Sequence, residues 1–265
     1  MKKRKLRWQI KLILFLILLV VYSFTLGTKG IFVKEYKLET NKINSKLDGI
    51  KIIQFSDLLY GSSTKKKTVS SLIKKINITK PDIVIFTGGL IKNRYNLTDK
   101  EEDFLIKELS NINSELGKYY VLDKNIDTTY EDILTKSGFI SLHNEEQIFY
   151  KSINNPIAII SNTNCKKFFS NNKDFNGFKI LAINNPNKYD NYKKYNFDAV
   201  FSGHTLNGQI YIPKLNNYII NSKYYKPYQK INNTKLFINN GIGTKYLPAR
   251  LFNHPTINLY RLYKK

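Results

Sequence analysis

The sequence contains few of the residues that most often crosslink a small domain or bind its metals. Its 265 residues include 1 cysteine and 3 histidines. A single cysteine, Cys165, excludes an internal disulfide, and it does not fix the redox compartment. The chain also has no internal repeat and no hinge between domains. With 42% hydrophobic residues, it is long enough to bury one sizeable core, so one globular domain is expected.

Acidic residues are scarce as well. The chain has 20 Asp and Glu against 43 Lys and Arg, and its formal net charge is +23. Such a charge favours polyanionic partners, such as acidic phospholipid headgroups, anionic wall polymers or nucleic acid. No recognised nucleic-acid module and no aromatic platform interleaved with Arg is present, so no specific nucleic-acid site is expected. The lysines are scattered among many Asn, Ile and Tyr residues, which an AT-biased genome would also explain.

The one long apolar run lies near the N-terminus, over residues 12–26. A membrane span needs about 20 apolar residues, a length reached when Trp8 and Ile10 are counted and Lys11 snorkels to the interface. Residues 22–26 are bulky and form no small-residue cleavage pattern. Residues 1–28 are therefore predicted to be an uncleaved signal anchor that crosses the cell membrane once. Five cationic residues within residues 1–7 favour an extracytoplasmic domain.

After the anchor, apolar strands alternate with amphipathic helices. Residues 29–49 are predicted to form a linker with a first strand, and residues 50–265 the globular domain. Apolar runs at 51–55 and 83–86 indicate strands. Shorter strands follow later in the chain, including one predicted at residues 209–212. Strands that first alternate with helices and then cluster indicate two packed sheets with helices outside.

One turn carries a metal-site pattern with a substitution. Residues 203–209 read Gly-His-Thr-Leu-Asn-Gly-Gln. This segment resembles a turn of the calcineurin-like metallophosphoesterases that reads Gly-His-Thr-His-Gly-Gly-Gln and presents two imidazoles to two metal ions. His204 retains the first imidazole, and Leu206 stands in place of the second. A leucine side chain has no lone pair for a metal.

The resemblance extends from residue 51 to the C-terminus. It implies an α/β fold, a four-layer α-β-β-α sandwich, and two divalent cations (manganese, iron or zinc) held roughly 3.5–4 Å apart by a bridging carboxylate. Residues 56–59 read Ser-Asp-Leu-Leu and resemble the family's Ser-Asp-x-His, with Asp57 retained and Leu59 in place of the imidazole. Residues 87–90 read Thr-Gly-Gly-Leu where the family has Thr-Gly-Asp-Leu, so Gly89 replaces the bridging carboxylate.

Two further motifs are altered in the same way. Residues 123–127 read Asp-Lys-Asn-Ile-Asp and resemble Gly-Asn-His-Asp, with Asn125 retained and Ile126 in place of the imidazole. Asn184 stands where the family's His-Asn-Pro has a ligand imidazole. The resemblance thus leaves Asp57, Asn125 and His204 as remnant ligands. A two-metal site is predicted to be absent, since Asn125 and His204, with the amide oxygen of Asn184, would support at best one loosely bound ion.

The retained residues also have ordinary structural interpretations. Asp57 at a strand end suits a turn, and a lone His204 is more often a hydrogen-bonded residue than a ligand. His143 and His254 match no ligand position and are interpreted as surface or packing residues. Arg250 lies in a segment that resembles the family's late Leu-Pro-x-Arg, where it suits either anion binding or a buried hydrogen-bonding role.

We therefore predict a membrane-anchored metallophosphoesterase-like protein without hydrolase activity, which binds an anionic envelope component (lipid or polymer) or a partner protein. Two alternatives remain open. One is an active phosphoesterase or phosphodiesterase whose altered metal site uses Asp57, Asn125, His204 and either Asp123 or Asp127. The other is a basic protein whose surface charge binds the membrane.

Overall fold

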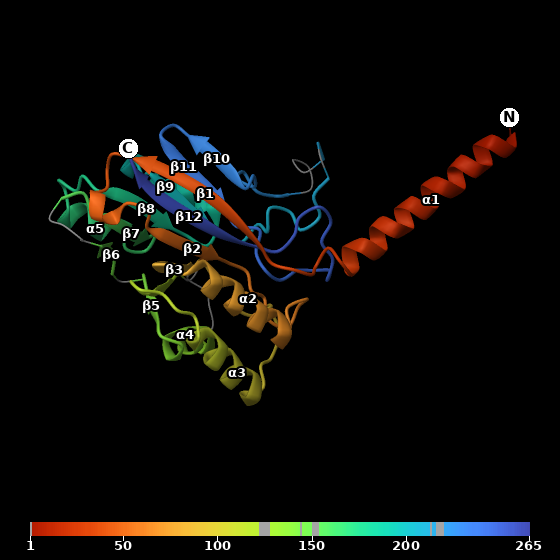
Figure 1. Ribbon diagram of the computed structural model, residues 1–265, viewed down its shortest axis with the longest axis horizontal. Coiled ribbons are helices and arrows are strands. Elements are labelled where there is room, and N and C mark those ends of the chain that lie inside the picture. Colours follow the sequence, from red (N-terminus) through yellow and green to blue (C-terminus); the bar gives the residue numbers. More distant parts are fainter. Residues whose placement is uncertain (1, 122–127, 144, 150–153, 213, 216–219) are drawn as a thin grey trace.

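The computed structural model describes residues 2–121, 128–143, 145–149, 154–212, 214–215 and 220–265. In this part of the chain, two six-stranded sheets lie face to face, and helices cover their outer faces (Figure 1). The predicted four-layer α-β-β-α sandwich is therefore confirmed. One further helix projects from the end of the sandwich (Figure 1).

The first sheet, called sheet 1, has the strand order β1-β12-β2-β3-β4-β5. Its neighbours run parallel except β12 and β2, which are antiparallel. The segment predicted as a linker with a first strand supplies the edge strand of this sheet. The bounds are β1 Phe32–Thr40, β2 Lys51–Phe55, β3 Ile83–Phe86, β4 Lys118–Tyr120, β5 Phe139–Ser141 and β12 Thr256–Lys264.

The second sheet, called sheet 2, has the strand order β10-β11-β9-β8-β7-β6. Its four central strands are parallel, and both edge strands are antiparallel to their neighbours. The bounds are β6 Gln147–Phe149, β7 Ile157–Ser161, β8 Phe178–Ala182, β9 Ala199–Ser202, β10 Tyr228–Ile231 and β11 Thr234–Ile238. The prediction of a strand at residues 209–212 is wrong. In this segment only Ile210 pairs with another residue, in an isolated bridge with Leu251, so no ladder of paired residues forms.

The helices form where apolar residues recur at helical spacing. Helix α3 also has a capping box, in which Thr98 and Glu101 each satisfy the other's backbone N–H. The helical bounds are α1 Lys2–Phe24, α2 Lys66–Thr79, α3 Asp99–Ser110, α4 Thr128–Lys136 and α5 Cys165–Asn171, with the 3-10 helices η1 Ser45–Leu47 and η2 Pro186–Tyr195.

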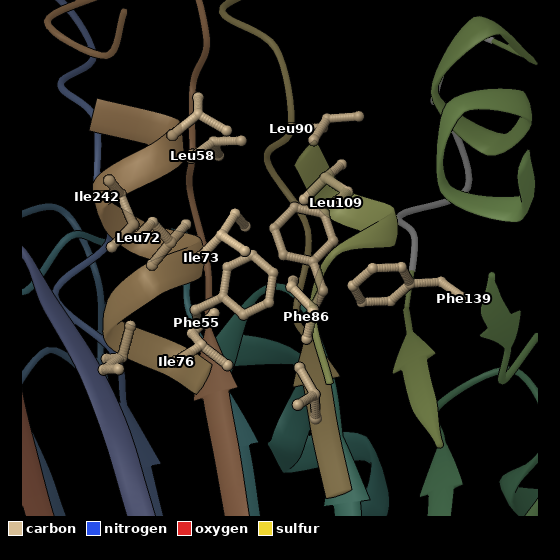
Figure 2. Packing of buried hydrophobic residues seen from close by; sticks show 14 of the residues in the cluster. Phe55, Leu58, Leu72, Ile73, Ile76, Phe86, Leu90, Leu109, Phe139 and Ile242 are labelled. Carbon is tan, nitrogen blue, oxygen red and sulfur yellow. The ribbon is translucent and has the colours of Figure 1, made fainter. Parts of the chain in front are cut away.

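Alternating strand residues separate the buried side chains into three layers. On β2, Ile52 faces the layer between the two sheets, whereas Ile53 and Phe55 face the helices. Figure 2 shows Phe55 and Phe86 from neighbouring strands against Leu72 of α2. A third layer lies between sheet 2 and the segment that contains α5 and η2. With both faces covered, the sheets hold their strand ends at fixed positions.

Helix α1 differs from the others because it covers neither sheet. Residues 7–24 have a mean hydropathy of 1.8, and only 6% of this stretch is buried. By length and composition alone, it is able to cross a membrane. Its last turn contacts the sandwich, as described below.

Candidate functional site

The predicted site residues that the structure describes lie on loops that leave the carboxyl ends of strands in both sheets. Backbone hydrogen bonds join these loops. The N–H of Asp57, after β2, donates to Gly88 O after β3 (2.7 Å), and the N–H of Gly203, after β9, donates to Asn184 O after β8 (3.1 Å). The loop after β11 reaches the first pair, because Gly243 N–H donates to Asp57 O (2.8 Å). Motifs far apart in sequence thus converge at one end of the sandwich, called the remnant centre here.

Asp57 lies in the middle of the remnant centre and is 2% exposed. Its Oδ2 accepts hydrogen bonds from the Ser56 hydroxyl (2.7 Å) and from the His204 backbone N–H (2.8 Å). The carboxylate therefore fastens the β2 loop of sheet 1 to the β9 loop of sheet 2. This contact holds the loops together without a metal ion.

Gly89 lies directly beside Asp57. A Cβ atom on Gly89 would stand 3.0 Å from Asp57 Oδ1 and 2.9 Å from Asp57 Cα. An aspartate at this position would place a second carboxylate next to the first, where a ligand that bridges two cations is needed. Gly89 offers no ligand, and neither does Leu59, which is buried in the adjacent loop and whose N–H donates to Gly89 O (2.9 Å).

Leu206 packs against Gly241, as Asp57 does. Its side chain is 2% exposed. A Cβ on Gly241 would lie 2.4 Å from Leu206 Cδ2 and 2.9 Å from Asp57 Cβ, so the three residues are in close contact. Only glycine fits at position 241, where φ is +71°. The position that resembles a ligand imidazole is thus part of a packed apolar contact.

The side chain of Asn184 also forms a hydrogen bond within the protein. Its amide nitrogen donates to Thr87 O (2.8 Å), across the two sheets. A Cβ on Gly88 would stand 2.4 Å from that nitrogen, so the glycine makes room for the amide. Asn184 therefore joins the β8 loop to the β3 loop.

His204 is half-buried and has a positive φ of 67°. Its backbone N–H donates to Asp57, and its carbonyl oxygen accepts a hydrogen bond from the Lys245 ammonium (2.5 Å). Of the predicted remnant ligands, the structure brings Asp57 and His204 together. Asn125, Ile126, Asp123 and Asp127 lie outside the described residues.

The described residues do not fit a binuclear centre. Across the described ranges, no group of three or more His, Cys, Asp or Glu side chains is arranged to hold a metal ion. Two cations need several carboxylate and imidazole ligands, with one carboxylate shared between them. At the positions where the resemblance implies such ligands, Gly89 has no side chain and Leu206 has an alkyl side chain, so neither supplies a ligand atom.

Arg250 is fully buried beneath the remnant centre and binds the backbone. Its guanidinium donates to the carbonyl oxygens of Asn253 (3.1 Å), Asn240 (3.0 Å), Gly241 (3.1 Å) and Gly243 (2.6 Å). Burial lowers the pKa of Arg250 to about 10, and the nearby negative charge of Asp57 opposes this effect. Arg250 thus clamps the loop after β11 in place, and the guanidinium lies away from solvent.

The other two histidines lie away from the remnant centre. His254 Nε2 forms a hydrogen bond with the Tyr22 hydroxyl of α1 (3.1 Å), and the His254 ring is 4.9 Å from that of Phe32. His143 lies on an exposed loop, where its backbone N–H donates to the Ser141 hydroxyl (3.2 Å).

A cavity of about 430 Å³ opens beside the remnant centre. His204 and Leu206 form one wall, and Lys245 and Gln209 form another. None of its described lining residues is acidic. Lys245 is absent from the predicted site, although it lies only two residues before the Leu-Pro-x-Arg segment at residues 247–250. The cavity therefore offers one cation and several neutral polar groups to a ligand.

The chain resembles several known phosphoesterases over most of its length. It is 27% identical to the uncharacterized metallophosphoesterase YkuE of Bacillus subtilis, over 86% of this chain and 84% of the relative. It is 26% identical to the UDP-2,3-diacylglucosamine pyrophosphatase LpxG of Chlamydia muridarum, over 81% of this chain and 84% of the relative. These relatives are named as phosphoesterases or pyrophosphatases, so the likeness of this chain to the calcineurin-like metallophosphoesterases, first seen in its motifs, extends over most of the sequence.

Comparisons with solved structures and with family models give less information than the sequence relatives. The calcineurin-like phosphoesterase YfkN of Bacillus subtilis superposes with a TM-score of 0.48 at 12% identity, over 74% of this chain and 82% of YfkN. No family model matches the chain. The likeness to metallophosphoesterases therefore depends on the sequence relatives, and the fold on the observed layers.

Proposed function

We propose that this metallophosphoesterase relative is held at the membrane by α1 and binds a phosphate-bearing envelope ligand without cleaving it. The observation that supports the proposal most directly is the packing of Leu206, beside Asp57, against Gly241 at the remnant centre. A buried leucine and a glycine take two ligand positions, so the side chains needed to hold two cations at a fixed distance are missing there.

The cavity supports the binding part of the proposal. Lys245 supplies a positive charge, and the described lining carries no carboxylate that would repel an anion. The Lys245 ammonium is held by the His204 carbonyl, so it is positioned before a ligand arrives. LpxG is named for a pyrophosphatase reaction on UDP-2,3-diacylglucosamine. We propose that the present chain has kept the recognition of a phosphate-bearing ligand of that kind and has lost its hydrolysis.

The proposal is tested on the full chain in mild detergent, with inorganic pyrophosphate as the probe. Lys245→Met removes the cavity's cation. We expect pyrophosphate to bind the variant about fivefold to tenfold more weakly than wild type, as befits loss of one charge-assisted contact. Isothermal titration calorimetry measures both constants.

Lys107→Met is the matched control, because Lys107 is exposed on α3, on the helical side of sheet 1. This variant has the same change in net charge and should bind pyrophosphate as wild type does. Equal weakening by both variants would contradict a cavity site and favour binding by overall charge. Turnover of a generic phosphodiester in the presence of manganese would contradict the non-hydrolytic part of the proposal.

A further inference from the structure

The end of helix α1 is attached firmly to the sandwich. Ser23 O, in its last turn, accepts a hydrogen bond from the Arg250 backbone N–H (2.8 Å). Gly27 lies so close that a Cβ on it would stand 1.9 Å from Arg250 O. The Tyr22 hydroxyl meets His254, as described above. These contacts fix the direction in which α1 leaves the domain.

The same attachment places Phe252 level with the last turn of α1. The rings of Phe252 and Tyr22 have centroids 6.5 Å apart. Phe252 is nevertheless 58% exposed. Its backbone has a positive φ of 53°, which is uncommon for a residue other than glycine. Tyr22 belongs to the apolar stretch 7–24. A bilayer that surrounds the last turn of α1 would therefore also reach Phe252.

Phe252 is one of several exposed apolar side chains at this end of the molecule. Gln209 ties two neighbouring segments together, since its amide donates to Leu247 O (2.8 Å) and to Ala249 O (3.0 Å). The loops concerned lie at the end of the sandwich from which α1 projects (Figure 1). We call this set the apolar rim, and its members are Leu26, Phe32, Tyr211, Ile212, Leu215, Tyr246, Leu247 and Phe252.

Elsewhere on the described part of the domain, the exposed large apolar side chains lie on four separate elements: Val33 on β1, Ile78 on α2, Ile140 on β5 and Tyr228 on β10. Ile78, which is 66% exposed, lies near the end of α2 and precedes β3. Since the remnant centre follows the carboxyl ends of β2 and β3, Ile78 is at the opposite end of sheet 1. An apolar surface that gathers beside one helix, while exposed apolar side chains elsewhere are scattered singly, marks an interaction site.

We propose that the apolar rim is a second membrane-contacting surface, which enters the bilayer interface beside α1. Aromatic side chains such as Phe252 and Tyr246 suit this depth, where one part is apolar and another is wet. Exposed Lys29 follows the helix and would meet anionic headgroups. The inference depends on the membrane attachment in the proposed function and is independent of ligand binding.

The rim also determines how the cavity is presented. Leu247 and Tyr246 belong both to the rim and to the cavity lining. With these residues at the interface, the cavity opens toward the lipid headgroups. A ligand with an acyl tail would then reach Lys245 without leaving the membrane.

Tryptophan fluorescence in vesicles tests the proposal on the full chain. The only tryptophan of the chain, Trp8, lies in α1 and is first replaced by phenylalanine. Phe252→Trp or Leu247→Trp then reports on the rim. In vesicles of phosphatidylglycerol and phosphatidylcholine, both should show blue-shifted emission, and brominated acyl chains should quench it about as strongly as they quench Trp8 of wild type.

Ile78→Trp in the same Trp8→Phe background is the matched control and should be neither shifted nor quenched. Leu247→Trp keeps the test valid if Phe252→Trp disturbs the contact with Tyr22. Unquenched rim tryptophans together with a quenched Trp8 would overturn the proposal, and so would an unquenched Trp8. Pyrophosphate binding measured on Phe252→Trp, whose residue does not line the cavity, reports separately on the cavity, so failure of one proposal is distinguishable from failure of the other.

Discussion

The ligand positions of the remnant centre and the clamp around Arg250 meet at Gly241, yet their chemistry differs. At the ligand positions, Gly89 and Leu206 offer nothing to a cation. At the clamp, a buried guanidinium reaches four carbonyl oxygens. The backbone arrangement of a metallophosphoesterase is thus maintained by hydrogen bonds and packing within the protein. The arrangement of these loops therefore does not require metal-binding side chains at positions 89 and 206.

The largest expected effect is on the clamp. Arg250→Met should destabilise the protein by about 5 kcal/mol or more, because each buried acceptor left unpaired costs about 1–3 kcal/mol. Urea denaturation followed by circular dichroism measures the loss. Arg250→Lys keeps the charge but lacks the planar fork, and an intermediate loss is expected. A loss below about 1 kcal/mol for Arg250→Met would contradict the clamp.

Leu206 is expected to contribute to packing at a ligand position. Leu206→Ala should cost about 2–4 kcal/mol, since a buried leucine is removed and a cavity remains beside Asp57. Leu247→Ala is the control, because that leucine is 53% exposed, and it should change stability by less than about 0.5 kcal/mol. Equal small effects of the two variants would show that position 206 is not packed as described.

A substitution at Gly89 is expected to lower stability by a smaller amount, through a backbone cause and a contact cause that can be measured separately. Gly89→Ala should cost about 1–3 kcal/mol through its positive φ and its contact with Asp57. Gly49→Ala has a similar φ of 76° with no atom within 4 Å, so it isolates the backbone part. The difference between the two free energies of unfolding measures the contact with Asp57. No difference would mean that Gly89 and Asp57 are further apart.

Much of the fold is predictable from local patterns. Leu72, Ile73 and Ile76 recur at helical spacing and form the buried face of α2. Ile52 and Ile53 lie on opposite faces of β2, as the period of a strand requires. These features follow from periodicity alone, because each element buries one face against a layer. The order of the motifs that resemble those of the calcineurin-like metallophosphoesterases then predicted which strand ends carry the site.

Other features depend on contacts between distant segments, which no local pattern contains. The sequence left open whether Arg250 binds an anion or the backbone. The four carbonyl oxygens around its guanidinium show that it binds the backbone. The cavity next to Lys245 arises from loops that follow different strands. The hydrogen bond between Ser23 and Arg250 joins residues 227 positions apart in the numbering of the chain, so the apolar rim was not foreseen.

Metal content tests the central claim most directly. The full chain, purified without chelator and incubated with manganese, zinc and iron(II) in turn, is analysed by plasma mass spectrometry after desalting, and its melting temperature is measured with each metal and with EDTA. We predict well under two metal ions per chain, and a melting temperature that neither rises with metal nor falls with EDTA. Two retained ions per chain, with a rise in melting temperature, would contradict the account.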